Sequence, residues 1–95
     1  MNTNLTPNEL RAALILVRVC FKGMGGNRPG DLADDPFTWV DAKDLIEAGY
    51  NRHEAAGTFG ALMEKGFVME NDKNSWIMTD AAWQYLDTIW DENKV

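Results

Sequence analysis

Apolar residues recur at spacings of three and four in several stretches of the chain, and the first of these stretches is the longest. It begins at Thr6 and Pro7, which are typical of a helix N-cap and first turn, and Glu9 stands at the reciprocal position of a capping box. The pattern predicts a helix over residues 6–24. One stripe of this helix is expected to enter the core: Leu10, Leu14, Val17, Phe21 and Met24.

This first helix has more apolar residues than one stripe can hold. Either a small domain wraps the helix from several sides, or part of its surface meets a partner subunit. The second interpretation predicts a homodimer. Its interface is expected to combine residues of the first helix with one residue of the last: Ile15, Leu16, Val19 and Trp90.

The middle of the chain predicts a loop, a short strand and two helices. Glycine and aspartate dominate residues 25–36, which favours a loop, and residues 37–40 have the aromatic and β-branched content of a short strand. Residues 41–66 predict a helix-turn-helix, because Asp41 and Asn51 suit helix N-caps and Gly49 suits the turn between them. The residues expected to be buried there are Leu45, Ile46, Ala48, Ala55, Phe59, Leu62 and Met63.

The last third of the chain predicts a hairpin and a final helix. Two short apolar runs flank a polar stretch within residues 67–79, which is typical of a β-hairpin. Thr79 then suits the N-cap of a helix over residues 80–91, whose Trp83, Leu86 and Trp90 share one face. The predicted fold class is therefore α+β, mostly α, in one domain over residues 1–95.

Three segments of the chain resemble winged helix-turn-helix proteins. They are LIEAG at residues 45–49, LMEKGFV at residues 62–68 and IMTDAAWQYL at residues 77–86, and they are similar to segments of the MarR-like transcriptional regulators. The resemblance implies a winged helix-turn-helix with N- and C-terminal flanking helices and a two-stranded β-hairpin wing. It also implies a homodimeric, non-catalytic regulator of transcription that binds double-stranded DNA.

The same resemblance implies which residues meet the DNA. The start of the second helix of the motif would offer Arg52 and His53 as hydrogen-bond donors, and the wing would offer Lys73. The rest of the helix face would be small, with Ala56, Gly57, Gly60 and also Thr58. Two glycines inside a helix cost about 1 kcal/mol each relative to alanine, so a close backbone approach or a smooth docking face is expected to require them.

The charge of the chain favours a different partner. There are 15 acidic residues against nine Lys and Arg, which gives a net charge of −6. Such a charge repels phosphate at long range and favours a basic protein surface. The alternative function is therefore an acidic winged-helix module that binds a protein instead of DNA. Accessory factors, inhibitors and nucleic-acid mimics, including those of phage or other mobile elements, belong to this class.

The main basic stripe lies on the first helix, where Arg11, Arg18 and Lys22 are seven and four residues apart. This spacing places the three side chains along one side of a helix. One interpretation is a contact with an anion or a partner. The other is a solvated face that balances nearby acidic residues.

Few residues in this chain can carry catalytic chemistry. With one histidine and one cysteine the sequence offers no histidine-rich metal set, and we expect no catalytic residues, no cofactor and no small-molecule substrate. Cys20 lies in an apolar run and is expected to pack as a small hydrophobe. The longest apolar run is too short to span a membrane, so we expect no membrane partner and a cytoplasmic location.

Overall fold

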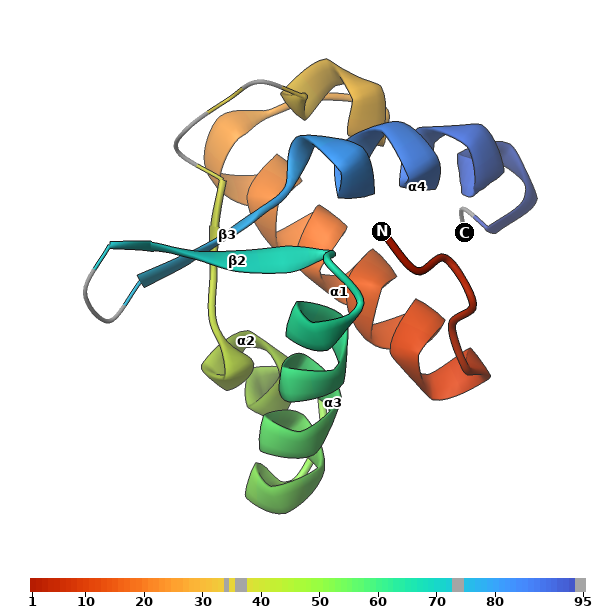
Figure 1. Ribbon diagram of the computed structural model, residues 1–95. Helices are drawn as coiled ribbons and strands as arrows, with labels where there is room; N and C mark the ends of the chain where they lie inside the picture. Colours follow the sequence, from red (N-terminus) through yellow and green to blue (C-terminus); the bar gives the residue numbers. More distant parts are fainter. Residues whose placement is uncertain (34, 36–37, 73–74, 94–95) are drawn as a thin grey trace.

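The structure is a computed structural model that describes residues 1–33, 35, 38–72 and 75–93. It is α+β and mostly helical, as the sequence predicts, with a three-stranded antiparallel sheet (Figure 1). In chain order the elements are α1 (Pro7–Met24), η1 (Pro29–Leu32), β1 (Trp39–Val40), α2 (Ala42–Glu47), α3 (Arg52–Glu64), β2 (Val68–Asp72), β3 (Ser75–Met78) and α4 (Asp80–Asn93). The η1 element is a single 3-10 turn within the stretch predicted as loop.

Helix α1 begins where the sequence predicts and runs through the middle of the fold. The Thr6 Oγ1 atom accepts a hydrogen bond from the Glu9 amide at 3.1 Å, and the Glu9 carboxylate accepts one from the Thr6 amide at 2.9 Å. Ala12, Ala13 and Leu16 are fully buried, so other elements cover α1 on more than one side. Met24, which was expected in the core, is the last residue of the helix and is 38% exposed.

The sheet has one strand more than the predicted two-stranded hairpin. Strand β3 is central and pairs with β2 on one side and with β1 on the other, so the sheet order is β1-β3-β2. Trp39 of β1 lies opposite Ile77, and Met69 of β2 lies opposite the same residue. The hairpin prediction was therefore incomplete, because a local pattern does not show that a two-residue strand pairs with a segment far along the chain.

Helices α2 and α3 lie side by side at one end of the molecule (Figure 1). Asp41 and Asn51 each cap a helix through a capping box, and Gly49 has a φ of +115°, which favours glycine in the turn. Leu45, Ala55 and Leu62 are fully buried. Three of the residues expected to be buried are instead exposed, because both helices are covered on one side only: Ile46, Ala48 and Met63.

A polar clamp attaches the chain around η1 to helix α4. The Arg28 Nε atom donates to Asp87 Oδ1 at 2.8 Å, and the Gly30 amide donates to the same oxygen at 2.9 Å. The Arg28 guanidinium also lies 3.5 Å from Asp91. These bonds hold a glycine-rich segment in one place on the helix.

Helix α4 starts at a threonine that also contacts the end of α3. The Thr79 Oγ1 atom accepts from the Ala82 amide at 3.1 Å and donates to the Gly66 carbonyl at 2.7 Å. Trp83 and Leu86 are fully buried beneath the helix. Among the described residues, no helix combines the length and the apolar character that crossing a lipid bilayer requires.

Candidate functional site

The outward face of α3 is formed by the residues that the sequence assigns to a binding surface. Arg52, His53, Ala56 and Gly57 are exposed, and Gly60 is half-buried. Thr58 is different, because it is 8% exposed and its Oγ1 accepts a hydrogen bond from the Asn8 side-chain amide at 3.1 Å. The sequence prediction that Thr58 faces outward was therefore wrong, and this residue attaches α3 to α1.

The two glycines of α3 have no packing role among the residues that the structure describes. A Cβ atom added at Gly57 or at Gly60 would meet no heavy atom within 4 Å outside the local helix backbone. Their φ angles are those of the helix, so the backbone does not require glycine there either. The free energy that these residues cost the helix is thus not recovered by packing among the described residues.

A tyrosine holds the turn before α3 against α1. Tyr50 is 5% exposed, and its hydroxyl donates to the Asn8 carbonyl at 3.2 Å. The Arg11 guanidinium lies 5.2 Å from the centre of the Tyr50 ring, in cation–π geometry. The sequence pattern gave Tyr50 no role, because its partners lie about 40 residues earlier in the chain.

The three-stranded sheet exposes large apolar side chains on one face. Trp39, Met69 and Ile77 occupy neighbouring register positions across the three strands and so share one face of the sheet. Trp39 is 57% exposed and Met69 is 49% exposed. Lys73, the predicted basic residue of the hairpin, lies outside the described residues.

The acidic residues of the clamp lie far from the start of α3. Figure 1 shows η1 and α4 at the end of the molecule opposite to the first turn of α3. The hydrogen bond from Arg28 lowers the pKa of Asp87, and the Gly30 amide contributes in the same direction. Asp87 is therefore ionised at neutral pH and forms an ion pair with Arg28.

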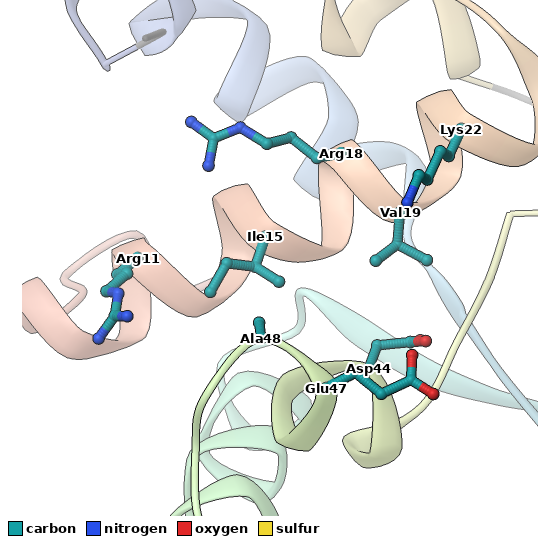
Figure 2. A pocket seen from close by; sticks show the side chains of 8 residues that line it. All are labelled: Arg11, Ile15, Arg18, Val19, Lys22, Asp44, Glu47 and Ala48. Atoms are coloured by element: carbon teal, nitrogen blue, oxygen red, sulfur yellow. The ribbon is translucent and has the colours of Figure 1, made fainter.

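A groove lies between α1 and α2, with opposite charges on its two sides (Figure 2). Its volume is about 600 Å³. We refer to it as the α1–α2 groove. It is lined by Arg11, Ile15, Arg18, Val19, Lys22, Asp44, Glu47 and Ala48.

The walls of this groove are unequal in their exposure to water. Asp44 is half-buried, and this burial raises its pKa, with the nearby carboxylates of Asp41 and Glu47 acting in the same direction. Figure 2 shows the Arg18 side chain directed away from α2, and Arg18 also lines a second groove beside Leu10 and Leu14. Arg18 therefore stands on a ridge between two grooves.

Two of the four predicted dimer residues have little or no accessible surface. Leu16 is fully buried within the chain, and Trp90 is 7% exposed with its ring 5.6 Å from that of Phe21. The assignment of Leu16 to a dimer interface is therefore corrected, since a core residue cannot meet a second copy. Ile15 and Val19 are half-buried and form the floor of the α1–α2 groove.

The described residues contain no cluster of three or more metal-ligating side chains. Cys20 is 4% exposed, and burial raises the pKa of its thiol to about 12, with the carboxylates of Asp44 and Asp35 contributing. A thiol with this pKa is protonated at neutral pH and is a poor nucleophile. The prediction that Cys20 packs in the core is confirmed.

The candidate binding surfaces are therefore the outward face of α3, the apolar sheet face with Trp39 and Met69, and the α1–α2 groove. Comparisons of the chain with protein-family models, curated proteins and solved structures found no match.

Proposed function

We propose that this protein is a small winged-helix regulator of transcription that inserts the first half of α3 into a groove of double-stranded DNA. In this proposal α2 and α3 are the helix-turn-helix, α3 is the recognition helix and the β2–β3 hairpin is the wing. Strand β1 pairs with β3 on the side opposite to β2.

The observation that carries the proposal is the shape of the α3 face. Gly57 and Gly60 have open space where a side chain would be, and Ala56 beside them adds only a methyl group. A helix with so little relief can approach the floor of a groove closely, while Arg52 and His53 at its first turn reach base edges or phosphates. The partial positive charge of the helix N-terminus favours phosphate at the same place.

The net charge of −6 opposes DNA binding less than the number alone implies, because some of the acidic residues are far from α3. Asp87 and Asp91 are engaged by Arg28 at the opposite end of the molecule. At physiological ionic strength an exposed charge acts over about 8 Å, so acids at that end have little effect on phosphates bound at α3.

The test is a selection from a pool of randomised duplexes at low salt, followed by fluorescence anisotropy on the enriched sequence. We expect one enriched motif, and we expect Arg52→Ala to weaken binding by about 1–3 kcal/mol. Lys43→Ala is the matched control, because Lys43 is an exposed basic residue of α2 that lies off the α3 face. Failure of every duplex to bind at low salt would refute the proposal.

One observation favours the second candidate, a module that docks on a protein. Trp39 and Met69 are large apolar residues that are about half exposed on one face of the sheet, and such surfaces are typical of protein interfaces. An affinity purification with Met69→Glu as the comparison tests this candidate. A partner that is recovered by the wild type and lost by the variant, from a protein that enriches no duplex, would establish protein docking.

A further inference from the structure

The α1–α2 groove is a surface that DNA binding through α3 does not use. None of the residues on the outward face of α3 lines it. Its floor is apolar, with Ile15, Val19 and Ala48, and its two sides carry opposite charges. A groove with this composition requires an explanation of its own, whichever partner α3 binds.

The charges on the two sides do not neutralise each other. Among the described residues, the recorded ion pairs join Arg28 to α4 and Lys65 to Glu9, and none crosses the α1–α2 groove. Arg11 and Lys22 on α1 thus remain separate from Asp44 and Glu47 on α2. An occupant that covered the apolar floor would remove these groups from water, so it would have to bring a compensating charge to each side.

The spacing along α1 indicates the shape of that occupant. Arg11 and Lys22 are eleven residues apart, which is about 16 Å at the rise of an α-helix. A second helix laid along α1 has the same rise, so two of its carboxylates eleven residues apart can meet Arg11 and Lys22 together. Arg18 lies between them along α1, but its side chain is directed away from α2 (Figure 2), so Arg11 and Lys22 are the cations of this match.

We propose that the α1–α2 groove binds an amphipathic helix of a partner protein, whose acidic flank faces α1, whose basic flank faces α2 and whose small apolar residues cover the floor. This is the helix-in-groove mode of recognition. The half-buried Asp44, which is desolvated already, attracts a lysine or arginine on the basic flank.

A second copy of this chain does not supply such a helix. Helix α4 has acidic residues but no lysine or arginine, and α1 has Glu9 as its one carboxylate. Helix α3 has Glu54 and Glu64 but Arg52 as its one lysine or arginine, and α2 has Lys43 beside its carboxylates but is only six residues long. The charge pattern therefore indicates a different protein as the source of the bound helix.

The experiment uses two synthetic peptides of identical composition, each about 18 residues long and so longer than the 16 Å of the groove. Both have a ridge of Ala and Leu with Glu and Lys on its two flanks. In the first, matched peptide all Glu lie on one flank and all Lys on the other. In the second peptide Glu and Lys are exchanged between the flanks over half of the length, so that each flank carries both charges in whichever direction the helix lies. Each is titrated into the full-length ¹⁵N-labelled protein while amide chemical shifts are recorded. We expect the matched peptide to bind at least about tenfold more tightly and to shift amides of α1 and α2.

A charge exchange in the protein distinguishes docking from misfolding. The double variant Lys22→Glu/Glu47→Lys should prefer the second peptide, and a misfolded protein could not gain that preference. Lys43→Glu, a change of the same sign on the exposed side of α2, should leave the preference unchanged. Equal binding of both peptides, shifts confined to other elements, or self-association that Lys22→Glu abolishes would each overturn the proposal.

Discussion

At the scale of single residues, substitution by alanine should have opposite effects on stability at Gly30 and at Gly57. A Cβ atom at Gly30 would lie 2.9 Å from Asp87 Oδ1, the atom that the Gly30 amide and Arg28 both bind. Gly30→Ala must displace this carboxylate, and we expect it to lower the free energy of unfolding by about 1 kcal/mol. Urea denaturation measures the change.

At Gly57 the same substitution should act in the other direction. Because a Cβ atom there meets open space, Gly57→Ala should raise the free energy of unfolding by about 1 kcal/mol. If α3 enters a DNA groove, this more stable variant should bind the selected duplex more weakly, since the methyl group separates the two surfaces. Gly23→Ala, also in open space but near the end of α1, is the control for binding. If Gly57→Ala binds the duplex as tightly as the wild type, the explanation that Gly57 allows close approach of α3 to DNA is wrong.

Acid stability depends on two carboxyl groups with lowered pKa values. A side-chain bond from Lys65 lowers the pKa of Glu9 below 4.5, and one from Arg28 lowers the pKa of Asp87 below 3.8. Their contribution is complete above those ordinary values and is lost as the pH falls through the lower folded-state values. Asp44, whose pKa is raised, partly offsets this loss because it takes up its proton at higher pH in the folded protein.

We therefore expect the urea concentration at the midpoint of unfolding to decrease as the pH is lowered below about 4. In the Asp87→Asn variant this concentration should depend less on pH in the same range. Glu92→Gln is the matched control on the same helix, because Glu92 is exposed and takes no part in the clamp around Arg28. An Asp87→Asn protein with the acid dependence of the wild type would show that the clamp does not contribute.

Sequence reasoning succeeded at residues whose partners are close in the chain. The capping boxes at Thr6, Asp41 and Asn51 join residues three positions apart, so a local pattern contains all the information that they need. The contact of Arg28 with Asp87 spans 59 residues, and nothing local distinguishes either residue from an ordinary surface charge. Tyr50 was passed over for the same reason.

At the scale of elements, Thr79 is the residue that connects α3, the sheet and α4. Its hydroxyl caps α4 and donates to Gly66, and its amide donates to the Phe67 carbonyl. Thr79→Val keeps the shape but loses the cap and leaves the Gly66 carbonyl without that donor. We expect a loss of about 2 kcal/mol in the free energy of unfolding, of which the cap accounts for about half.

Thr88→Val is the control for this prediction. Thr88 lies on the same helix and also donates to a carbonyl, that of Tyr85 at 2.6 Å, but it is exposed. Water can replace its hydrogen bond, so the loss should be well under 1 kcal/mol. Equal effects of the two substitutions would show that the connection through Thr79 adds nothing to an ordinary threonine.

The helices could be predicted because burial on one side imposes a period that the sequence displays. The pairing of β1 with β3 could not, since Trp39 and Ile77 are far apart in the chain, with α2, α3 and β2 between them. The α1–α2 groove was missed in the same way. The basic stripe of α1 was visible in the sequence, but the acidic wall opposite it belongs to α2 and becomes a neighbour only in the folded chain.

At the scale of the whole molecule, the small number of basic residues near α3 determines how DNA binding should respond to salt. The α3 face and the hairpin offer at most Arg52, His53 and Lys73 to phosphates. Each neutralised phosphate contributes about 0.9 to the slope of log K against log salt concentration, so the slope should be no steeper than about −3. Anisotropy at several salt concentrations measures it. A steeper slope would mean that other basic residues, such as those of α1, contact the DNA.

The position of the charges also predicts that one acidic residue limits the affinity more than all the distant ones. Glu54 lies two positions after Arg52 in the first turn of α3, where phosphate would bind. Glu54→Gln removes the negative charge and retains an oxygen for the capping bond from the Asn51 amide, so the helix should remain intact. We expect about threefold tighter DNA binding at low salt, with a smaller gain as salt screens the charge. Asp91→Asn at the opposite end should change the affinity little. If the two substitutions have equal effects, net charge and not its position governs binding, and the argument that the acids of α4 are too distant to oppose DNA fails.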